Sequence, residues 1–144
     1  DLPNFLLNIK KFIMSLFIDH VVITVTDINK SIHFYSNILG MELQEFLSTT
    51  DNVKRKSLKF GTQKINLHEA SKPFKPHAHK PLSGTMDICF LSEINVNDWI
   101  KIFDKFDIKI EDGPVIKTGA NGTIKSIYVR DPDKNLIEIS NQNY

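Results

Sequence analysis

Apolar residues recur at every second position in several short stretches of the chain, which is the pattern of a β-strand with one buried face. Stretch 18–26 is rich in β-branched residues and ends before Asp27, a suitable N-cap for a helix over 28–39 that stops at Gly40. Three further strand-like runs follow at 41–49, 54–61 and 64–70. The first half is therefore predicted to fold as a β-α-β-β-β unit.

The same order of elements recurs in the second half of the chain. The pattern predicts a strand over 85–93, a helix over 95–106, a short strand near 108–111, a Gly/Pro loop, and two closing strands at 123–130 and 135–140. Duplication of one unit is the economical explanation of this repeat.

The repeat predicts an α+β fold in which paired βαβββ modules form a cupped, partly closed β-sheet. We expect a single domain over 16–144, in which module one (16–70) is joined by a proline-broken linker (71–84) to module two (85–144). Residues 1–15 are expected to form an amphipathic arm that packs on the domain or on a partner, with a retained targeting remnant as the alternative.

Strand alternation indicates which side chains share the concave face of the cup. Ile137 and Ile139 take the core side of the last strand, so Glu138 takes the other side. The same parity turns inward His20 of the first strand, Asn66 and His68 of the fourth, and Asp87 of the fifth. A buried carboxylate without a partner costs several kcal/mol, and this mixture of nitrogen and oxygen donors suits a divalent metal.

Bulk properties narrow the choice of partners. The 144 residues carry a formal charge of +1, which indicates neither nucleic acid nor an anionic membrane as a partner. No apolar run approaches the roughly 20 residues that span a bilayer. The single cysteine, Cys89, excludes an internal disulfide, which favours a reducing compartment such as the cytoplasm. We interpret its side chain as a core thiol unless it borders the metal.

Two segments carry a family resemblance. "DHVVITVTDINKSIHFYSNILGME" together with "IYVRDPDKNLIEI" resembles the vicinal oxygen chelate superfamily of glyoxalase I, fosfomycin-resistance transferases, extradiol dioxygenases, methylmalonyl-CoA epimerase and bleomycin-resistance proteins. "KINLHE" and "GTMDIC" look most like its glyoxalase domain-containing protein 5 group. The resemblance covers about residues 16–144 and implies the same paired-module fold around one divalent metal.

The resemblance also implies roles for individual residues. His20 falls on the first-strand metal ligand, and Glu138 on the last-strand carboxylate that also transfers protons. Either Asn66 or His68 falls on the fourth-strand ligand position; we expect His68 to be the metal ligand and Asn66 to contact substrate. Asp87 stands where histidine is usual, which moves the site toward harder ions such as Mn²⁺ or Mg²⁺, away from Ni²⁺ or Zn²⁺, and leaves open a site without metal.

Three residues of the seventh predicted strand complete the expected site. Ser126 and Tyr128 match substrate-contacting positions of fosfomycin-type relatives, whereas Arg130 either contacts substrate or lies at the rim and pairs with Asp131 or Asp133. The loop 117–122 is interpreted either as a closing flap or as an ordinary connection.

The function that these expectations describe is glyoxalase I-like isomerisation of a small oxygenated substrate such as a hemithioacetal, for example a glutathione conjugate. The reaction would pass through a metal-stabilised enediolate. The metal would be Zn, Ni, Mn, Fe or Mg. Alternatives are epimerisation, thiol transfer, dioxygenation, or metal-free binding of a small molecule as in bleomycin-resistance proteins. A homodimer is expected, and the sequence leaves open whether its sites form within one chain or across two.

Overall fold

The computed structural model of the chain describes Asn4 and residues 16–143, so most of the arm predicted at 1–15 lies outside the described residues. Module one contains β1 (His20–Val25), α2 (Ile28–Ile32), the π-helical segment η1 (His33–Ile38), β2 (Glu42–Leu47), β3 (Lys54–Phe60) and β4 (Gln63–Glu69). Module two contains β5 (Asp87–Leu91), α3 (Val96–Lys105), β6 (Asp112–Gly119), β7 (Gly122–Arg130) and β8 (Leu136–Asn141).

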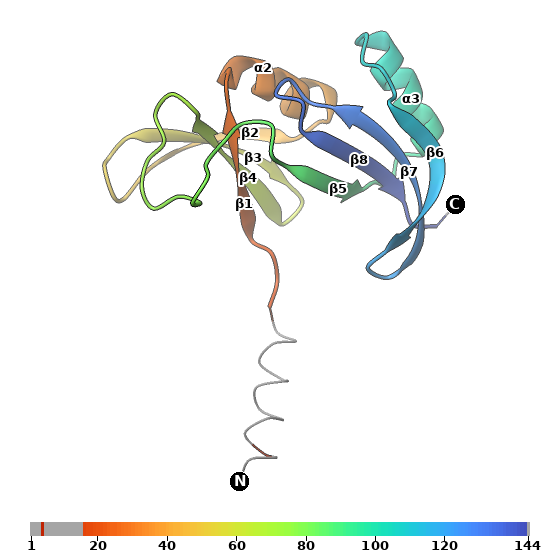
Figure 1. The fold of residues 1–144 in the computed structure, drawn as a ribbon, viewed down its shortest axis with the longest axis horizontal. Helices are drawn as coiled ribbons and strands as arrows, with labels where there is room; N and C mark the ends of the chain where they lie inside the picture. Colours follow the sequence, from red (N-terminus) through yellow and green to blue (C-terminus); the bar gives the residue numbers. More distant parts are fainter. Residues whose placement is uncertain (1–3, 5–15, 144) are drawn as a thin grey trace.

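Each module contributes one four-stranded sheet. The strand orders are β1-β4-β3-β2 and β5-β8-β7-β6, and in each sheet the first and last strands of the module pair in parallel. The two sheets lie side by side, with α2 and α3 on the same side of the molecule (Figure 1). This repeated topology confirms the prediction of paired βαβββ modules.

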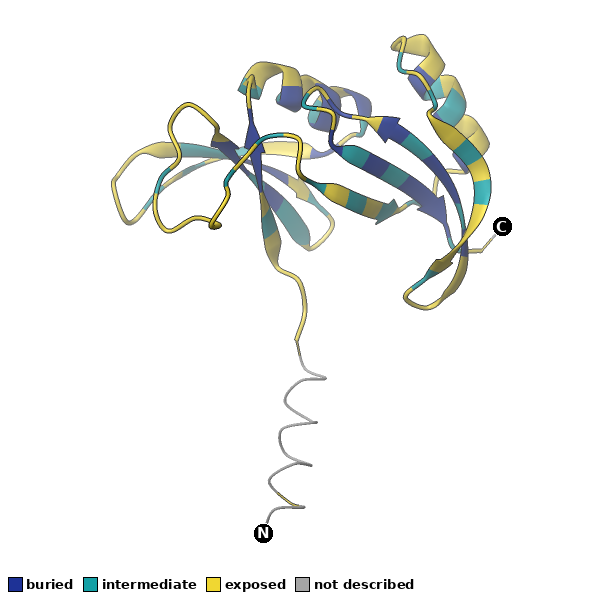
Figure 2. Ribbon diagram, in the orientation of Figure 1, coloured by how far each residue is buried: buried dark blue, intermediate teal, exposed yellow. Residues whose placement is uncertain are grey.

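Register decides which residues share the concave face. Val22 of β1 lies beside Asn66 of β4, and Cys89 of β5 lies beside Glu138 of β8. On the opposite face, Ile137 and Ile139 are buried in the core, as the alternation predicts. Figure 2 shows half-buried and buried positions alternating over the first four residues of β8, whose last residues are all buried.

One hydrophobic core joins both modules beneath the helices. Apolar burial is the main favourable term in folding, and here it links the two sheets because their core faces share one cluster. The cluster includes Val25, Phe34, Tyr35, Leu58, Ile65, Trp99, Phe103, Ile127, Val129 and Ile137.

Capping residues set where the helices begin. The Asp27 carboxylate accepts from the backbone N–H groups of Asn29 and Lys30 at 3.0 and 3.1 Å, as its N-cap assignment predicts. Asn95 accepts from the Asn97 N–H at 2.8 Å and begins α3 in the same way. Across the part of the chain that the structure describes, no helix is long and apolar enough to cross a membrane.

The sixth strand differs from its prediction. Residues 108–111 were expected to form it, and the following Gly/Pro segment was expected to be a loop. In the structure β6 spans Asp112–Gly119, so that segment is itself the strand. Its register with β7 shifts between Asp112 and Val115. Pro114 lies inside this irregularity, where the regular β6–β7 hydrogen-bond ladder is already interrupted, so the backbone N–H that proline lacks is not needed.

Candidate functional site

Glu138 lies at the centre of a hydroxyl cluster on the concave face of module two. Its Oε2 accepts from the Ser126 hydroxyl at 2.6 Å and from the Ser140 hydroxyl at 3.1 Å. The two serine oxygens are themselves 2.7 Å apart. Ser140 was not predicted as a site residue, although its position two residues after Glu138 on the same strand face is the signal that would have found it.

Hydrogen bonding keeps Glu138 ionised. Partial burial raises the pKa of a carboxyl group, but donors from Ser126, Tyr128, Ser140 and Cys89 outweigh that effect and hold the Glu138 pKa below its ordinary value of 4.5. Burial and the neighbouring carboxylate raise the pKa of Tyr128 to about 12. At neutral pH the site therefore combines an ionised carboxylate with a neutral phenol.

A cavity of about 370 Å³ opens in front of Glu138. Its walls include Cys89, Leu91 and Ile124, and its roof is the turn 118–121 that joins β6 to β7. This turn belongs to the segment that the sequence offered either as a flap or as an ordinary connection; here it is the tip of a hairpin. The cavity has room for a small ligand beside the carboxylate.

Cys89 is exposed, so its interpretation as a core thiol is wrong. β5 is the edge strand of its sheet, and Cys89 turns toward the concave face, where few groups cover it. Its Sγ lies 3.2 Å from the Ser140 hydroxyl. Partial burial and the nearby carboxylates raise the pKa of the thiol, so it is protonated at neutral pH and serves as a wall of the cavity.

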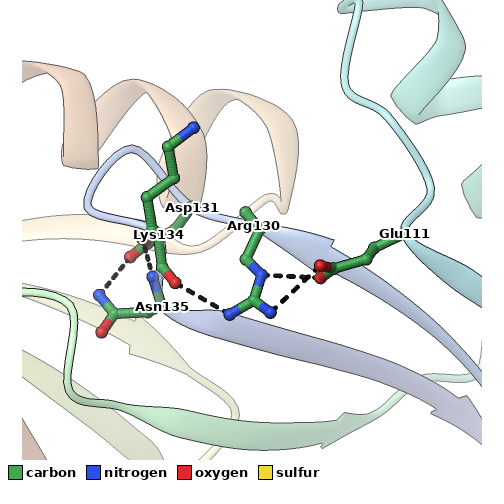
Figure 3. A network of polar contacts seen from close by, with 5 residues as sticks. All are labelled: Glu111, Arg130, Asp131, Lys134 and Asn135. Carbon is green, nitrogen blue, oxygen red and sulfur yellow. Dashed lines mark hydrogen bonds and ion pairs between the residues drawn. The ribbon is translucent and has the colours of Figure 1, made fainter.

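Arg130 binds a residue that the sequence did not indicate. Its guanidinium donates to the Glu111 carboxylate at 2.7 and 3.2 Å and to the Lys134 carbonyl at 3.1 Å (Figure 3). Its partner is thus Glu111 rather than Asp131 or Asp133. These contacts place Arg130 in an exposed ion pair at the end of β7, two positions from Tyr128.

His20 begins β1 in module one and is exposed. Its Nδ1 lies 2.7 Å from the Asp19 carboxylate, which leaves Nε2 available to a further partner. Metal-binding histidines are commonly oriented in this way, by a carboxylate that hydrogen-bonds to the ring nitrogen facing away from the metal.

Asn66 and His68, the two candidates on β4, have different surroundings. The Oδ1 atom of Asn66 is buried and has no hydrogen-bond partner among the described residues, and the Ser57 hydroxyl beside it in the register is in the same state. An unpaired buried acceptor on the concave face is the kind of atom that a cation or a donor satisfies.

His68 is engaged differently. Its ring packs against Phe74 of the linker, with centroids 4.1 Å apart and the ring planes tilted by 37°. The Arg55 guanidinium lies 3.6 Å from the centroid of the same phenyl ring. Burial, followed by the charges of Arg55 and His77, lowers the pKa of His68. The ring also lines a separate cavity of about 130 Å³ under the linker. These contacts hold the linker on module one.

Asp87 is exposed at the start of β5, beside Leu136 in the register. The chain thus carries its oxygen and nitrogen donors on two sheets: His20 and Asn66 on the first, Asp87 and Glu138 on the second. Within Asn4 and 16–143, no three His, Cys, Asp or Glu side chains gather closely enough to hold a metal ion. The donor types suit a divalent ion, whereas a single chain does not bring them together.

The family model described as the Glyoxalase/Bleomycin resistance protein/Dioxygenase superfamily matches residues 17–139. The chain belongs to this superfamily. The match spans both modules and leaves out little beyond the arm, in agreement with the repeated topology.

Similar proteins occur in bacteria and in a fungus. Virulence protein STM3117 of Salmonella typhimurium is 48% identical over 123 residues, which are 85% of this chain and 82% of that protein. Glyoxalase domain-containing protein RDO1 of Mycosarcoma maydis is 47% identical over 123 residues, 85% of this chain and 66% of that protein. The chain thus spans just under two thirds of the fungal relative.

Solved structures share the fold. Integron cassette protein VCH_CASS1 of V. cholerae is 41% identical, with a TM-score of 0.82 over 89% of this chain and 96% of that one. Two distant structures show the fold alone. Lactoylglutathione lyase of Agrobacterium tumefaciens is 21% identical, with a TM-score of 0.64 over 89% of this chain and 94% of that one. The antibiotic-binding protein TnmS3 of Streptomyces sp. CB03234 is 15% identical, with a TM-score of 0.65 over 88% of this chain and 95% of that one.

Proposed function

We propose that this protein is a glyoxalase I-type isomerase that uses Glu138 to move a proton within a substrate carrying two adjacent oxygens, such as a hemithioacetal. The observation that carries the proposal is the ionised Glu138 carboxylate beside a cavity of about 370 Å³. A carboxylate that is ionised at neutral pH and within reach of a bound substrate can act as a general base.

The proposed step requires no oxidant. Glu138 accepts the proton from the carbon that bears the hydroxyl, and it returns that proton to the neighbouring carbonyl carbon. One C–H bond breaks, one forms, and the hydroxyl and carbonyl exchange places when a proton moves between their oxygens. We propose that the Tyr128 phenol, neutral because its pKa is about 12, donates a hydrogen bond to a substrate oxygen.

A divalent ion, when bound, would supply positive charge that polarises the two substrate oxygens. His20, Asp87, Glu138 and the unpaired Oδ1 of Asn66 are the residues we propose to hold it. His68 is the less suitable β4 ligand because its ring is packed against Phe74. The carboxylate-rich set favours Mn²⁺ or Mg²⁺ over Zn²⁺ or Ni²⁺, with Fe²⁺ between them.

We propose that two copies of the chain complete the site. One chain holds the donors on two separate sheets and does not cluster them within its described residues. Pairing of module one of one copy with module two of the other in a homodimer would bring the two half-sets together. The single cysteine is in keeping with a cytoplasmic setting, and a thiol such as glutathione is the proposed co-substrate.

A second candidate function is metal-free binding of a small molecule. One observation favours it: the Glu138 carboxylate already has hydroxyl partners from Ser126 and Ser140 within a single chain. A carboxylate satisfied in this way needs no cation for its stability. In this case Glu138 would accept a hydrogen bond from a bound ligand and no turnover would occur.

Metal content and turnover of one purified sample distinguish the two functions. We would measure bound metals by mass spectrometry and isomerisation of the hemithioacetal of methylglyoxal and glutathione, with each candidate metal added in turn. We expect Glu138→Gln to lower kcat by roughly 10²-fold or more. Glu111→Gln is the control, because Glu111 is an exposed carboxylate paired with Arg130 outside the cavity.

Stoichiometric metal with turnover that only Glu138→Gln removes would support the isomerase. If wild-type protein takes up no metal and turns over none of the hemithioacetal, the isomerase proposal is wrong. Binding of small oxygenated ligands without turnover would then support the second function.

A further inference from the structure

A second cavity, of about 380 Å³, lies between β5 and module one. Module one contributes Leu39, Met41 and Phe60 to its lining, and module two contributes Phe90 and Trp99. β5 is an edge strand, so no neighbouring strand in its own sheet covers this side. The cavity is distinct from the one in front of Glu138.

The two cavities meet at β5. Cys89 and Leu91 line both of them, and in the register Cys89 lies beside Glu138 while Leu91 lies beside Ser140. Leu91 is 60% exposed, so its apolar side chain is open to a ligand at the place where the two cavities meet. A molecule that lies along Leu91 can therefore contact both cavities.

The second cavity has an apolar, aromatic lining. Phe60 and Phe90 meet edge to face with centroids 5.3 Å apart. The Trp99 Nε1–H already donates to the Ser92 hydroxyl at 2.8 Å, so its indole presents only apolar surface. None of the described residues around this cavity carries a charge, whereas the first cavity holds the Glu138 carboxylate.

From this continuity we infer that the substrate is amphipathic: its oxygenated head lies at Glu138, and an uncharged alkyl or aryl tail passes over Leu91 into the cavity between Phe60 and Trp99. The inference rests on the proposed function for the position of the head. The tail would be uncharged because burying an unpaired charge among these side chains is unfavourable. Selectivity for tail length and apolarity would then reside in β5 and its neighbours.

A homologous series of ligands tests the inference on the full chain. The probes are 1-hydroxyalkan-2-ones, which carry two adjacent oxygens and an alkyl tail that is lengthened one methylene at a time. Trp99 is the only tryptophan in the sequence and lines the second cavity, so its fluorescence reports occupancy of the tail position. We expect Kd to fall by about twofold to fourfold per methylene until the cavity is filled.

Two matched variants separate the tail from general effects. Leu91→Glu places a charge where the cavities meet, and it should flatten the dependence of Kd on tail length, because lengthening the tail no longer gains affinity past a charged side chain. Ile116→Glu makes the same change at a residue that is 54% exposed on β6 and lines neither cavity, so the dependence should remain. Both sites are exposed, which limits any effect on folding.

Glu138→Gln distinguishes failure of the head assignment from failure of the tail assignment. It should change Kd for every homologue by the same factor and leave the dependence on tail length intact. An intact dependence without any hemithioacetal turnover would overturn the isomerase and keep the tail site.

Two results would overturn the tail site itself. The first is a wild-type Kd that does not depend on tail length. The second is a Leu91→Glu protein that keeps the dependence but changes its oligomeric state in sedimentation, which would assign this surface to a second copy of the chain.

Discussion

The Tyr35 hydroxyl donates a 2.7 Å hydrogen bond to Oδ2 of Asp131, and both side chains are buried. Tyr35 belongs to η1 of module one, whereas Asp131 begins the turn between β7 and β8 of module two. The same carboxylate accepts from the backbone and side-chain amides of Asn135, whose Oδ1 accepts from the Met86 N–H (2.8 Å). A hydrogen-bond network thus joins the modules beside the strand that bears Glu138.

Removing this hydroxyl should destabilise the protein. We expect Tyr35→Phe to lower the free energy of unfolding by about 1.5–3 kcal/mol, because a buried bond to a charged acceptor is lost. Denaturant unfolding of Tyr35→Phe, Asp131→Asn and the double variant measures the coupling. Strict additivity of the two single changes would contradict a direct energetic link between these side chains.

Acid dependence of activity should report the hydroxyl donors of Glu138. Because the pKa of Glu138 lies below 4.5, kcat/KM should begin to fall only below that pH as the carboxylate becomes protonated. Ser126→Ala removes a donor to the carboxylate, so the pKa and the acid limb should move to higher pH. Thr123→Ala, at an exposed position of the same strand, should leave the limb in place. An unmoved limb in Ser126→Ala would remove Glu138 from the role of base.

His68 should make stability depend on pH. Its pKa is lowered in the folded protein, so below about 6.5 the unfolded chain binds more protons and stability falls as the pH decreases toward the folded pKa. Above this window the contribution is fully present. His68→Phe should keep the ring contact with Phe74 and weaken the pH dependence of the thermal unfolding temperature. His33→Gln, at an exposed position of η1, should leave that pH dependence unchanged. Identical profiles for wild type and His68→Phe would refute the assignment.

Gly113 should tolerate no side chain. Its φ is +100°, and a Cβ atom would lie 2.4 Å from the Ser126 carbonyl oxygen. We expect Gly113→Ala to cost about 3 kcal/mol or more in unfolding free energy, from backbone strain together with the clash. Gly122 has a similar φ of +106° with open space around it, so Gly122→Ala should cost only about 1–2 kcal/mol. Equal losses would show that the close approach to β7 is unimportant.

A site shared between two copies should be restored by mixing inactive variants. His20→Ala and Glu138→Gln change different modules, so a heterodimer would retain one intact site built from the unaltered halves. Co-expression of the two variants should recover about a quarter of wild-type turnover at statistical pairing. Purified heterodimers without any turnover would show that His20 and Glu138 act from the same chain.

Alternation along the strands was sufficient to place the concave face. Side chains in a strand alternate between its two faces, which puts four polar residues on the concave face: His20, Asn66, Asp87 and Glu138. A slip of one residue in the register would have turned these polar side chains into the core. The strand over 112–119 was missed because glycine and proline indicate a loop in a local pattern. Its pairing with β7 is a long-range contact that the local pattern does not contain.

The sequence by itself determined the duplicated modules, the core stripes of each strand and the inward carboxylate, because these follow from local periodicity. Only the tertiary structure showed that the Asn66 Oδ1 lacks a partner among the described residues while His68 packs against Phe74, that Cys89 is exposed, and that Arg130 pairs with Glu111. These contacts depend on how the chain folds back on itself, as in the pairing of Arg130 with Glu111, which lie 19 residues apart. The ionised state of Glu138 also depends on tertiary structure, because hydroxyl groups from two adjacent strands, β7 and β8, donate to its carboxylate. The alternation of residues suggests that these groups share a face, and the pairing of the two strands brings them together.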